Sequence, residues 1–409
     1  MKVELIKEPN DNYSATVQVL TNRGIKPEDI GIYIASTMDN VNKPTAFGEE
    51  NMKQGARMLM SHVAANDDIL VIVDADCDGF TSAALLINYL SDVFPAFVEN
   101  HLHWFIHSGK QHGLSDCLDE AMNYKLVICP DSSSNDYDYH DALSKQGIDV
   151  LVLDHHEADH ISENACIINN QMSDYPNKEL SGVGVTWQFC RYLDSLGGNT
   201  YANDYLDLAA TGIIADARNM TTLGNNFLAY YGLSHIRNQF LKEIIIKQAR
   251  GIKDPANLSK IDVAFYVAPI INGVIRSGTQ EDKERVFKAL STAESDQMFE
   301  SEYHGVKREE NLWQYAARLA FNAKSRQDAA KKKGFELITE LIDKNGWDKH
   351  NLIIATIDDK RAEKINPNFT GLIARELVKK YNKPCLLLRA TEFNGEELYG
   401  GSGRNGNFY

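Results

Sequence analysis

Three short apolar segments of this chain are each followed by acidic residues, and this pattern constrains the fold more than any other feature. The segments are Ile69–Val73, Leu126–Cys129 and Val150–Leu153. Stretches with helical spacing of apolar residues lie between them, around residues 81–94 and 139–145. Alternating strands and helices predict a parallel sheet with helices on its faces, so we expect an α/β fold.

The acidic residues after these segments are expected to meet in one crevice, because the carboxyl ends of parallel strands lie at the same edge of a sheet. They are Asp74, Asp76, Asp78, Asp131 and Asp154, and the last is followed by His155 and His156. Carboxylates crowded into one site raise each other's pKa unless cations neutralise them. Oxygen ligands with one or two histidines suit Mn²⁺ or Mg²⁺. Two such ions, about 3.5–4 Å apart, can clamp the attacking and leaving oxygens of a phosphoryl displacement.

Each acidic segment taken alone has a simpler interpretation. Residues 74–79 could form an acidic turn or a partial calcium loop, although Ile87 and its neighbours are apolar where a calcium loop has a bidentate glutamate. Asp131 could be a turn residue after proline, and the two histidines could be solvated loop residues. Acid at three successive strand ends is improbable as three accidents, so the combined pattern favours a metal site.

Composition places the chain among globular proteins. It has 409 residues, enough for two or three domains, with 43% hydrophobic and 24% charged residues. Six scattered cysteines without a CxxC pair indicate a reducing cytosol, and no apolar run approaches the ~20 residues that span a membrane. We therefore expect a cytoplasmic protein with no membrane contact. The net charge of −15 predicts weak non-specific affinity for nucleic acid and strong dependence on salt and divalent metal.

The order of patterns along the chain predicts four parts. Residues 1–60 form an N-terminal helical segment, and residues 61–297 form the catalytic α/β domain. Residues 298–345 are charged and strongly helical and predict a connecting helix. Residues 346–409 form a smaller α/β domain, which we interpret as incomplete because the chain stops soon after a Gly-rich turn around Arg404.

The combination of residues 74–82, Asp131 and residues 154–156 resembles the DHH phosphoesterases. Further segments resemble the RecJ branch of that superfamily and occur in the family's order. They are residues 20–25 with Arg23-Gly24, 181–185, 210–216, 268–276, 368–374 and 401–404. The similarity covers nearly the whole chain. It implies a parallel-sheet DHH domain, a long connecting helix and a smaller DHH-associated domain. One departure is the serine run at residues 132–134, where the family usually has Cys-Gly.

The resemblance also implies roles for individual residues. The implied metal ligands are Asp74, Asp76, Asp78, Asp131, Asp154, His155 and Asp216. Asp131 would bridge the two ions, and the implied catalytic residues are Asp131, Asp154 and His156. His156 would contact the scissile phosphate. The other candidate substrate-binding residues are Lys110, His112, Gly184, Asn272, Arg276, Ser402 and Arg404. The segment with Lys110 and His112 could instead be a polar loop, Gly184 could serve only close packing, and Arg404 could be a surface arginine in an ordinary turn.

By this resemblance the chain would hydrolyse single-stranded DNA with Mn²⁺ or Mg²⁺, releasing mononucleotides in the 5′→3′ direction. Two alternatives stay open. One is a DHH phosphodiesterase of short oligonucleotides or cyclic dinucleotides, and the other is a non-catalytic replication or repair scaffold. RNA is a possible second substrate, a replication or repair protein a possible partner, and a phage a possible source of the gene.

Overall fold

The computed structural model describes residues 8, 10–109, 111–303, 306–358, 365–393 and 396–406. The chain divides into two units. The first comprises residues 1–275 and 279–319, and the second comprises residues 276–278 and 320–409. Helices α13 (Ala268–Ser277) and α15 (Leu312–Asn345) each contribute residues to both units.

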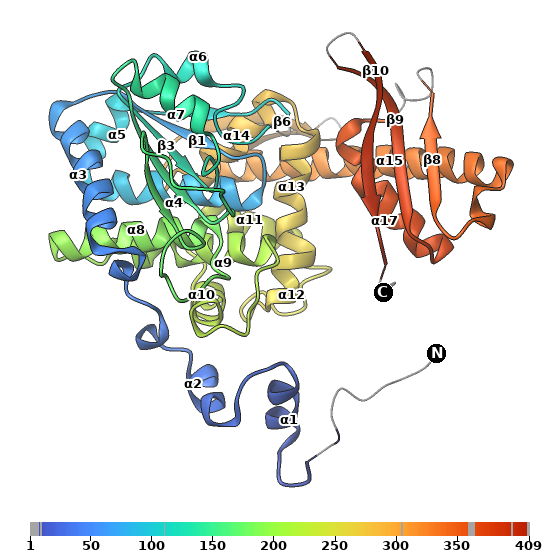
Figure 1. Cartoon of the computed structure of the whole chain (residues 1–409), viewed down its shortest axis with the longest axis horizontal. Coiled ribbons are helices and arrows are strands. Elements are labelled where there is room, and N and C mark those ends of the chain that lie inside the picture. Colours follow the sequence, from blue (N-terminus) through green and yellow to red (C-terminus); the bar gives the residue numbers. More distant parts are fainter. Residues whose placement is uncertain are drawn as a thin grey trace. The chain divides into compact units, whose positions relative to one another are not determined.

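A five-stranded parallel sheet forms the centre of the first unit (Figure 1). Its strands are β1 (Ile69–Val73), β2 (Leu102–Ile106), β3 (Leu126–Pro130), β4 (Asp149–Asp154) and β5 (Cys166–Asn169). They lie in the order β2-β1-β3-β4-β5, and every neighbouring pair is parallel. All residues of β1 and β3 are buried, as expected for strands covered on both faces.

Helices surround this sheet and extend the first unit at its N-terminal end and beyond the last strand. They are α1 (Ala15–Asn22), α2 (Ile30–Ala35), α3 (Glu49–Ala65), α4 (Cys77–Val93), α5 (Pro95–His101), α6 (Leu118–Ala121), α7 (Tyr137–Ser144), α8 (Gly182–Gly197), α9 (Leu206–Ala215), α10 (Leu223–Ser234), α11 (Gln239–Lys247), α12 (Lys260–Asp262) and α14 (Gln280–Leu290). A single π-helical turn, Val263–Val267, joins α12 to α13.

The two faces of the sheet pack against different helices. Alternate strand residues such as Leu70, Val127 and Val150 join the α6–α7 side, where Ala121 and Leu143 complete one apolar cluster. Helices α4 and α8 cover the opposite face, and α9 packs against both of them (Figure 1). This alternation follows from the two-residue period of a strand. It leaves the carboxyl ends of β1, β3 and β4 free to carry polar residues.

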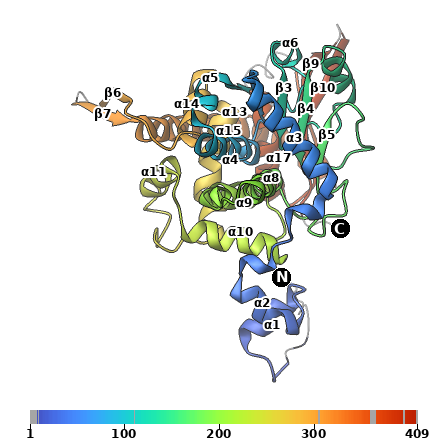
Figure 2. The same ribbon diagram turned by 90° about the vertical axis from the view of Figure 1, so that its left-hand side faces the viewer.

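The prediction of strands at residues 69–73, 126–129 and 150–153 is confirmed by β1, β3 and β4, and the helix predicted over residues 81–94 is confirmed by α4. The prediction that the connecting helix starts at residue 298 is wrong. Strands β6 (Met298–Tyr303) and β7 (Val306–Asn311) form an antiparallel hairpin, and the helix α15 begins at Leu312 (Figure 2). The Phe299 ring stacks on Tyr315 with centroids 4.4 Å apart, so packing against α15 stabilises the charged hairpin.

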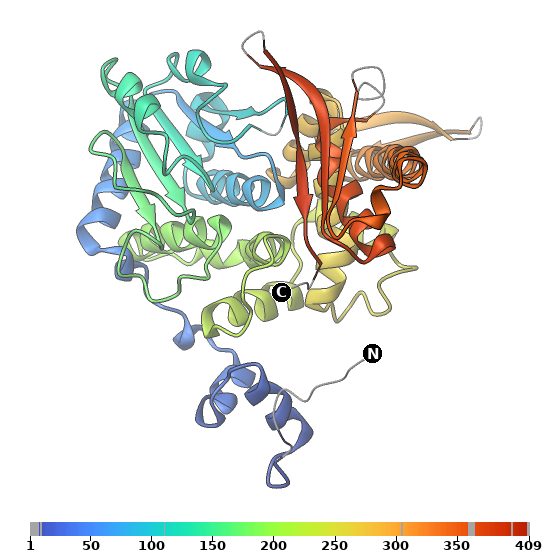
Figure 3. The same ribbon diagram turned by 45° about the vertical axis from the view of Figure 1, so that its right-hand side comes forward.

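The second unit contains a three-stranded sheet in the order β10-β9-β8 (Figure 3). Its strands are β8 (Ile353–Ile357), β9 (Cys385–Phe393) and β10 (Glu396–Arg404), and α17 (Thr370–Tyr381) packs against the sheet. Residues of α15 such as Ile338 and Ile342 complete this unit's apolar core. The prediction that Arg404 lies in a Gly-rich turn is wrong. Arg404 ends β10 and pairs with Cys385 of β9.

None of the helices in the described part of the chain is long and apolar enough to cross a membrane.

Candidate metal centre

The strand order of the first sheet marks one point at its carboxyl edge. The chain passes from β1 to β2 on one side and then crosses to β3 on the other, so the direction of winding changes between β1 and β3. Ligands of open α/β sheets bind in the crevice at such a switch point. Asp74 follows β1 directly, and Asp131 follows β3 directly. The topology therefore places the first two acidic segments on either side of this crevice.

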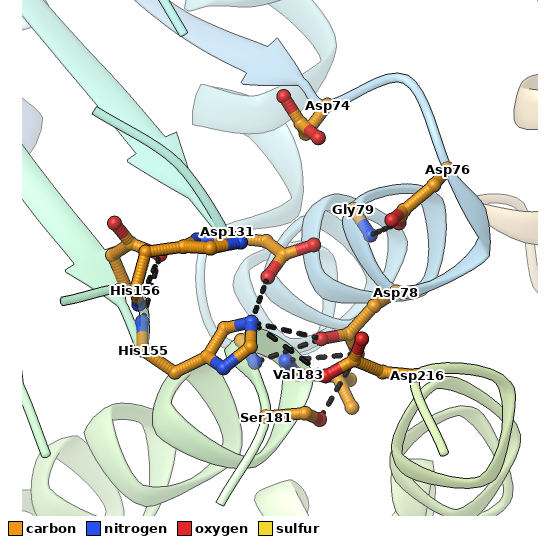
Figure 4. Close-up of polar contacts among 12 residues, drawn as sticks. Asp74, Asp76, Asp78, Gly79, Asp131, His155, His156, Ser181, Val183 and Asp216 are labelled. Atoms are coloured by element: carbon orange, nitrogen blue, oxygen red, sulfur yellow. Dashed lines mark hydrogen bonds and ion pairs between the residues drawn. The ribbon is translucent and has the colours of Figure 1, made fainter. Parts of the chain in front are cut away.

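The loop after β1 carries three carboxylates in different surroundings (Figure 4). Asp74 is buried, and its Oδ2 accepts a hydrogen bond from His112 Nδ1 at 2.7 Å. Asp76 is the N-cap of α4, where its Oδ1 accepts from the Gly79 amide at 3.0 Å. The cap fixes the start of the helix and with it the position of the Asp76 carboxylate.

Asp78 is buried in the first turn of α4 and is held by the start of α8 (Figure 4). Its Oδ2 accepts from the Gly182 amide at 2.8 Å, and its Oδ1 accepts from the Ser181 hydroxyl at 3.1 Å and the Val183 amide at 3.3 Å. A Cβ on Gly182 would lie 2.1 Å from Asp131 Oδ1, so only glycine fits there. The first amides of α8, which suit an anion, thus hold a carboxylate of the protein.

Asp131 adopts a backbone conformation that L-residues rarely take. Its φ is +67°, and Ser133 two residues later also has a positive φ of +78°. The Asp131 amide donates to the Leu153 carbonyl of β4 at 2.8 Å, which anchors the turn to the sheet. Its carboxylate is buried, with Oδ1 3.1 Å from His155 Nε2 (Figure 4). Backbone strain of this kind persists where the surrounding structure fixes a functional side chain.

The two histidines after β4 have opposite environments. His155 is buried, and its Nε2 lies 3.9 Å from Asp78 Oδ2 and 3.8 Å from Asp216 Oδ2. Burial, followed by the charge of His156, lowers the pKa of His155 to about 3, so its imidazole is neutral, as a metal ligand requires. His156 is 57% exposed, and its Nδ1 lies 2.8 Å from Asp154 Oδ1. That hydrogen bond raises the pKa of His156 to about 9, so this imidazole carries a positive charge at neutral pH.

Asp154 is fully buried and surrounded by donors. Its Oδ1 accepts from the His155 amide at 2.7 Å and from His156 Nδ1, and its Oδ2 accepts from the Ser134 amide at 3.2 Å. Burial alone would raise the pKa of Asp154, but the hydrogen bonds and charge of His156 and the Ser134 amide hold it at about 2. Asp154 therefore fixes the orientation of His156 and leaves lone pairs of Oδ2 toward the site.

Asp216 enters the site from the end of α9, far from the sheet in sequence. It is the residue after the helix, and Arg218 Nε lies 3.7 Å from its Oδ2. Burial raises the pKa of Asp216 to about 6, although Arg218 acts in the opposite direction. Its Oδ2 lies 3.8 Å from His155 Nε2, so the end of α9 joins the group that also contains Asp78.

The arrangement fits divalent cations on several independent grounds. Three groups of side chains have ligand atoms within 4.8 Å of one another, and they overlap through Asp131 and His155. The groups are Asp74-Asp76-Asp131, Asp78-His155-Asp216 and Asp131-Asp154-His155-His156. Asp74 Oδ1 and Asp131 Oδ1 are buried and accept no hydrogen bond, and the polar neighbour of Asp131 Oδ1 is the His155 ring, 3.1 Å away. Burial, then nearby carboxylates, raises the pKa of Asp131 well above its ordinary range and that of Asp78 to about 8. Cations would remove this cost of ionisation.

A cavity of about 420 Å³ opens beside these residues. It is lined by Asp131, Asp154 and His156, by residues 132–136, and by His112. Burial raises the pKa of Asp74, and the hydrogen bond to Asp74 raises that of His112, which lines the cavity. Lys110 lies outside the described residues. Gly184 is buried in the first turn of α8, where a Cβ would lie 2.4 Å from Leu180 Cδ1.

The remaining substrate-binding candidates are not among the residues gathered at the metal centre. Asn272 is on α13 in the first unit, and its Oδ1 is buried without a hydrogen-bond partner. Arg276, Ser402 and Arg404 belong to the second unit. There the Ser402 hydroxyl lies 3.0 Å from that of Thr370, and the Arg276 carbonyl accepts from Asn368 Nδ2 at 3.3 Å. Residues 368–374 and 401–404, two of the segments that resemble the RecJ branch, are therefore in contact through Thr370 and Ser402.

Sequence reasoning missed several residues that support the centre. Ser134 and Asn169 are buried, and Asn169 Nδ2 donates to the Ser134 hydroxyl at 2.8 Å and the His156 carbonyl at 2.9 Å. The serine run after Asp131 was a signal for Ser134, because it departs from the family's usual Cys-Gly. Arg218 follows the Asp216 motif by two residues and could have been found by its spacing. Asn169 has no local signal, since only the pairing of β5 with β4 brings it near.

Comparison with known proteins agrees with this geometry. The family model described as "DHH family, N-terminal domain" matches residues 68–213. The chain is 30% identical over 408 residues to YorK, named a single-strand DNA-specific exonuclease from the SPbeta prophage of Bacillus subtilis (strain 168), covering 98% of this chain and 68% of that one.

Two further comparisons involve proteins named RecJ. The single-stranded-DNA-specific exonuclease RecJ of the same B. subtilis strain is 26% identical, over 85% of this chain and 41% of its own length. A crystal structure titled exonuclease RecJ bound to manganese superposes with a TM-score of 0.65 at 20% identity, covering 83% of this chain and 80% of that one. The chain therefore belongs to the DHH family, and within it to the RecJ-like branch.

Proposed function

We propose that the chain is a metal-dependent exonuclease that hydrolyses single-stranded DNA in the 5′→3′ direction and releases mononucleotides. The observation that carries this proposal is the cluster of carboxylates and imidazoles at the carboxyl edge of the sheet. Relatives that match most of this chain are named single-strand DNA-specific exonucleases, which supports the substrate class. The direction of cleavage rests on the resemblance to the RecJ branch.

Two Mn²⁺ or Mg²⁺ ions would be held by the overlapping groups of side chains. Asp74, Asp76 and Asp131 suit one ion, and Asp78, His155 and Asp216 suit the other. Asp131 belongs to the first set, and its Oδ1 lies 3.1 Å from Nε2 of His155 in the second set, which supports a bridging role. Bound there, the ions would polarise the phosphodiester and make a water acidic enough to act as a nucleophile near neutral pH.

His156 would act on the substrate through its charge. Its Nδ1 faces Asp154, so Nε2 carries the other proton of the imidazolium. The side chain is half exposed and lines the cavity, where it can donate to a phosphate oxygen. Positive charge at this point stabilises the negative charge that develops on the phosphoryl group. Asp154 would be a positioning residue as well as a ligand, because it holds this imidazole charged and oriented.

The second unit would contribute phosphate contacts. Arg404 is exposed at the end of β10, and the Ser402 side chain lies on the same strand. Arginine forms a planar fork of donors that matches phosphate oxygens. We therefore assign Ser402, Arg404, Arg276 and Asn272 to strand binding, and His112, which lines the cavity beside the metal centre, to the neighbourhood of the scissile phosphate.

The direct test is cleavage of single-stranded DNA and RNA labelled at the 5′ or the 3′ end, with Mn²⁺, with Mg²⁺ and with EDTA. The proposal predicts metal-dependent release of labelled mononucleotide from the 5′ end of long DNA. Cleavage of only di- to tetranucleotides or cyclic dinucleotides would replace it with a short-substrate phosphodiesterase. Absence of hydrolysis of every substrate would instead favour a binding scaffold.

A further inference from the structure

The Arg23-Gly24-Ile25 segment, which the metal centre does not use, forms part of a second cavity in the first unit. The cavity has a volume of about 720 Å³, within the range of small-molecule sites. It is bordered by residues 23–33 on one side, by residues 220–234 on another and by residues 256–261 on a third. We refer to it as the Arg23 cavity.

The local backbone explains why Arg23 and Ile25 both reach this cavity. Arg23 ends α1, and its amide donates to the Leu20 carbonyl at 3.1 Å. Gly24 then adopts a φ of +91°, which a residue with a Cβ rarely takes. The chain reverses, and the Ile25 amide also donates to the Leu20 carbonyl at 3.1 Å. As a result the Ile25 side chain is buried while Arg23 stays exposed beside it.

Specific hydrogen bonds join the walls of the cavity. The Tyr33 hydroxyl donates to the Met220 carbonyl at 2.9 Å, and Asn226 Nδ2 donates to the Tyr33 carbonyl at 2.8 Å. Lys260 Nζ donates to Asn226 Oδ1 at 2.8 Å. One asparagine of α10 thus connects the N-terminal segment with α12. The cavity is therefore a formed site and not a gap left between loosely placed segments.

The charge of the lining selects an anion. Arg23 and Lys260 are its charged residues, and no aspartate or glutamate is found among the described residues that line it. The whole chain has 57 acidic and only 42 basic residues, so a lining of this kind is not expected from composition. Burial, and then the nearby Arg23, lowers the pKa of Lys260. An anion between the two side chains would remove that repulsion.

The remaining lining is apolar and aromatic. Ala229 and Leu233 are buried in its floor, and Tyr230 and Ile261 are 61% and 67% exposed beside it. Exposed aromatic rings next to cations form stacking platforms for nucleobases. The volume, the paired cations and the ring together match a molecule with one phosphate and one flat apolar group.

We propose that the Arg23 cavity binds a nucleoside 5′-phosphate unit, with its phosphate between Arg23 and Lys260 and its base against Tyr230 and Leu233. The unit is either a free mononucleotide or one nucleotide of a single strand. The segment from Asp216 to Thr221 connects the cavity to the metal centre, since Met220 and Thr221 line the cavity. This site goes beyond the proposed hydrolysis and does not require it.

The test is binding of deoxyadenosine 5′-monophosphate to the full chain by calorimetry, in buffer containing EDTA. Without divalent ions the metal centre cannot bind the nucleotide through a metal, so a lack of nuclease activity would not affect this result. We expect saturable 1:1 binding that weakens about tenfold or more in the double variant Arg23→Met/Lys260→Met. The matched control Lys53→Met/Arg57→Met removes the same charge from α3 and should bind like the wild type.

Further variants and ligands separate the parts of the proposal. Tyr230→Ala changes an exposed ring, so it should leave the fold intact and weaken binding about tenfold. The charge-conserving Arg23→Lys/Lys260→Arg variant should retain most of the affinity. Deoxyadenosine and inorganic phosphate should each bind at least about tenfold more weakly than the nucleotide, because each lacks one half of the contacts.

A 5′-hydroxyl oligodeoxyadenylate distinguishes the two sources of the nucleotide. Displacement of the mononucleotide by this oligomer would show that the cavity takes a nucleotide of the strand, and failure to displace it would show a site for free nucleotide. The proposal is overturned by absent saturable binding, by equal affinity for inorganic phosphate, or by unchanged affinity in a folded Arg23→Met/Lys260→Met variant.

Discussion

The metal centre and the Arg23 cavity lie in the same unit of the chain but gather opposite charges by different means. In the metal centre, carboxylates are buried at the ends of strands, and several of their oxygens have no donor. In the Arg23 cavity, two cations lie at helix ends on a partly exposed apolar wall. The comparison shows why a net charge of −15 does not exclude a nucleic-acid enzyme, because both regions set their charge locally.

The largest effect that separates the two regions should come from Asp131→Asn. This change preserves shape but removes the charge of a ligand that adjoins both groups, so we expect hydrolysis to fall by more than about 10³-fold, beyond the 10–100-fold cost of losing an outer-shell partner. Binding of the mononucleotide in the Arg23 cavity should not change. Steady-state cleavage assays and the calorimetric measurement check both parts.

The same variant should lose hydrolysis but should not lose thermal stability in the absence of metal. Asp131 is buried beside other carboxylates, so its removal relieves repulsion and the metal-free variant should melt at the same temperature or higher. Wild type at Mn²⁺ concentrations 100 times the dissociation constant should gain about 2.7 kcal/mol in unfolding free energy for each bound ion, and the variant should gain much less. The exposed Asp138→Asn on α7 is the control. A metal-free melting temperature well below wild type would contradict the account.

Two adjacent histidines provide the next test. His155→Gln should weaken Mn²⁺ binding at least about ten- to hundredfold, because the imidazole ligand is lost. His156→Gln should leave Mn²⁺ affinity nearly unchanged but lower kcat about 10²-fold, because its charge acts on the phosphate. Mn²⁺ titration and kinetics at saturating Mn²⁺ separate the two effects. An equal loss of Mn²⁺ affinity in both variants would show that His156 is a ligand too.

A smaller effect is expected from Gly182→Ala. The new Cβ would be placed 2.1 Å from Asp131 Oδ1, and the shift would disturb the amide that donates to Asp78. We expect Mn²⁺ affinity to fall about tenfold, measured by titration. Gly197→Ala at the other end of α8 is the control, since its Cβ would meet only the exposed Asn199 side chain. Equal Mn²⁺ affinity of the two variants would show that the start of α8 does not position the metal ligands.

The smallest effect concerns Gly24 in the Arg23 cavity. An alanine there has free space around it but must adopt a φ near +91°. The strain should lower the unfolding free energy by about 1–2 kcal/mol and weaken binding of the mononucleotide, with no effect on Mn²⁺ binding. Thermal melting and calorimetry measure these changes. A stable Gly24→Ala variant with full nucleotide affinity would show that the turn does not position Arg23.

The central part of the fold could be predicted because its signals are local. The strands β1 and β3 are uniformly apolar, and each ends in acid at a predictable edge of the sheet. The gathering of Asp74, Asp131 and His155 follows from parallel topology alone. Asp216 required the resemblance, because nothing in its own segment places the end of α9 beside the sheet.

The elements that sequence analysis missed depend on contacts between distant residues. β2 follows α5 without a turn residue and is identified by its pairing with β1. The charged residues 298–311 have no glycine after Lys307 and suggested a helix, yet pairing of β6 with β7 and stacking of Phe299 on Tyr315 make them a hairpin. The glycines of β10 suggested a turn, but the antiparallel register with β9 makes them a strand.

The most direct test of the central claim is a calorimetric titration of the metal-free chain with Mn²⁺, compared with the Asp131→Asn variant. We expect two ions per chain in the wild type and at most one tightly bound ion in the variant, because Asp131 belongs to one set of ligands and its Oδ1 lies 3.1 Å from His155 of the other set. Binding of a single ion by wild type, or of two ions with unchanged affinity by the variant, would contradict a bridged two-metal centre at the edge of the sheet.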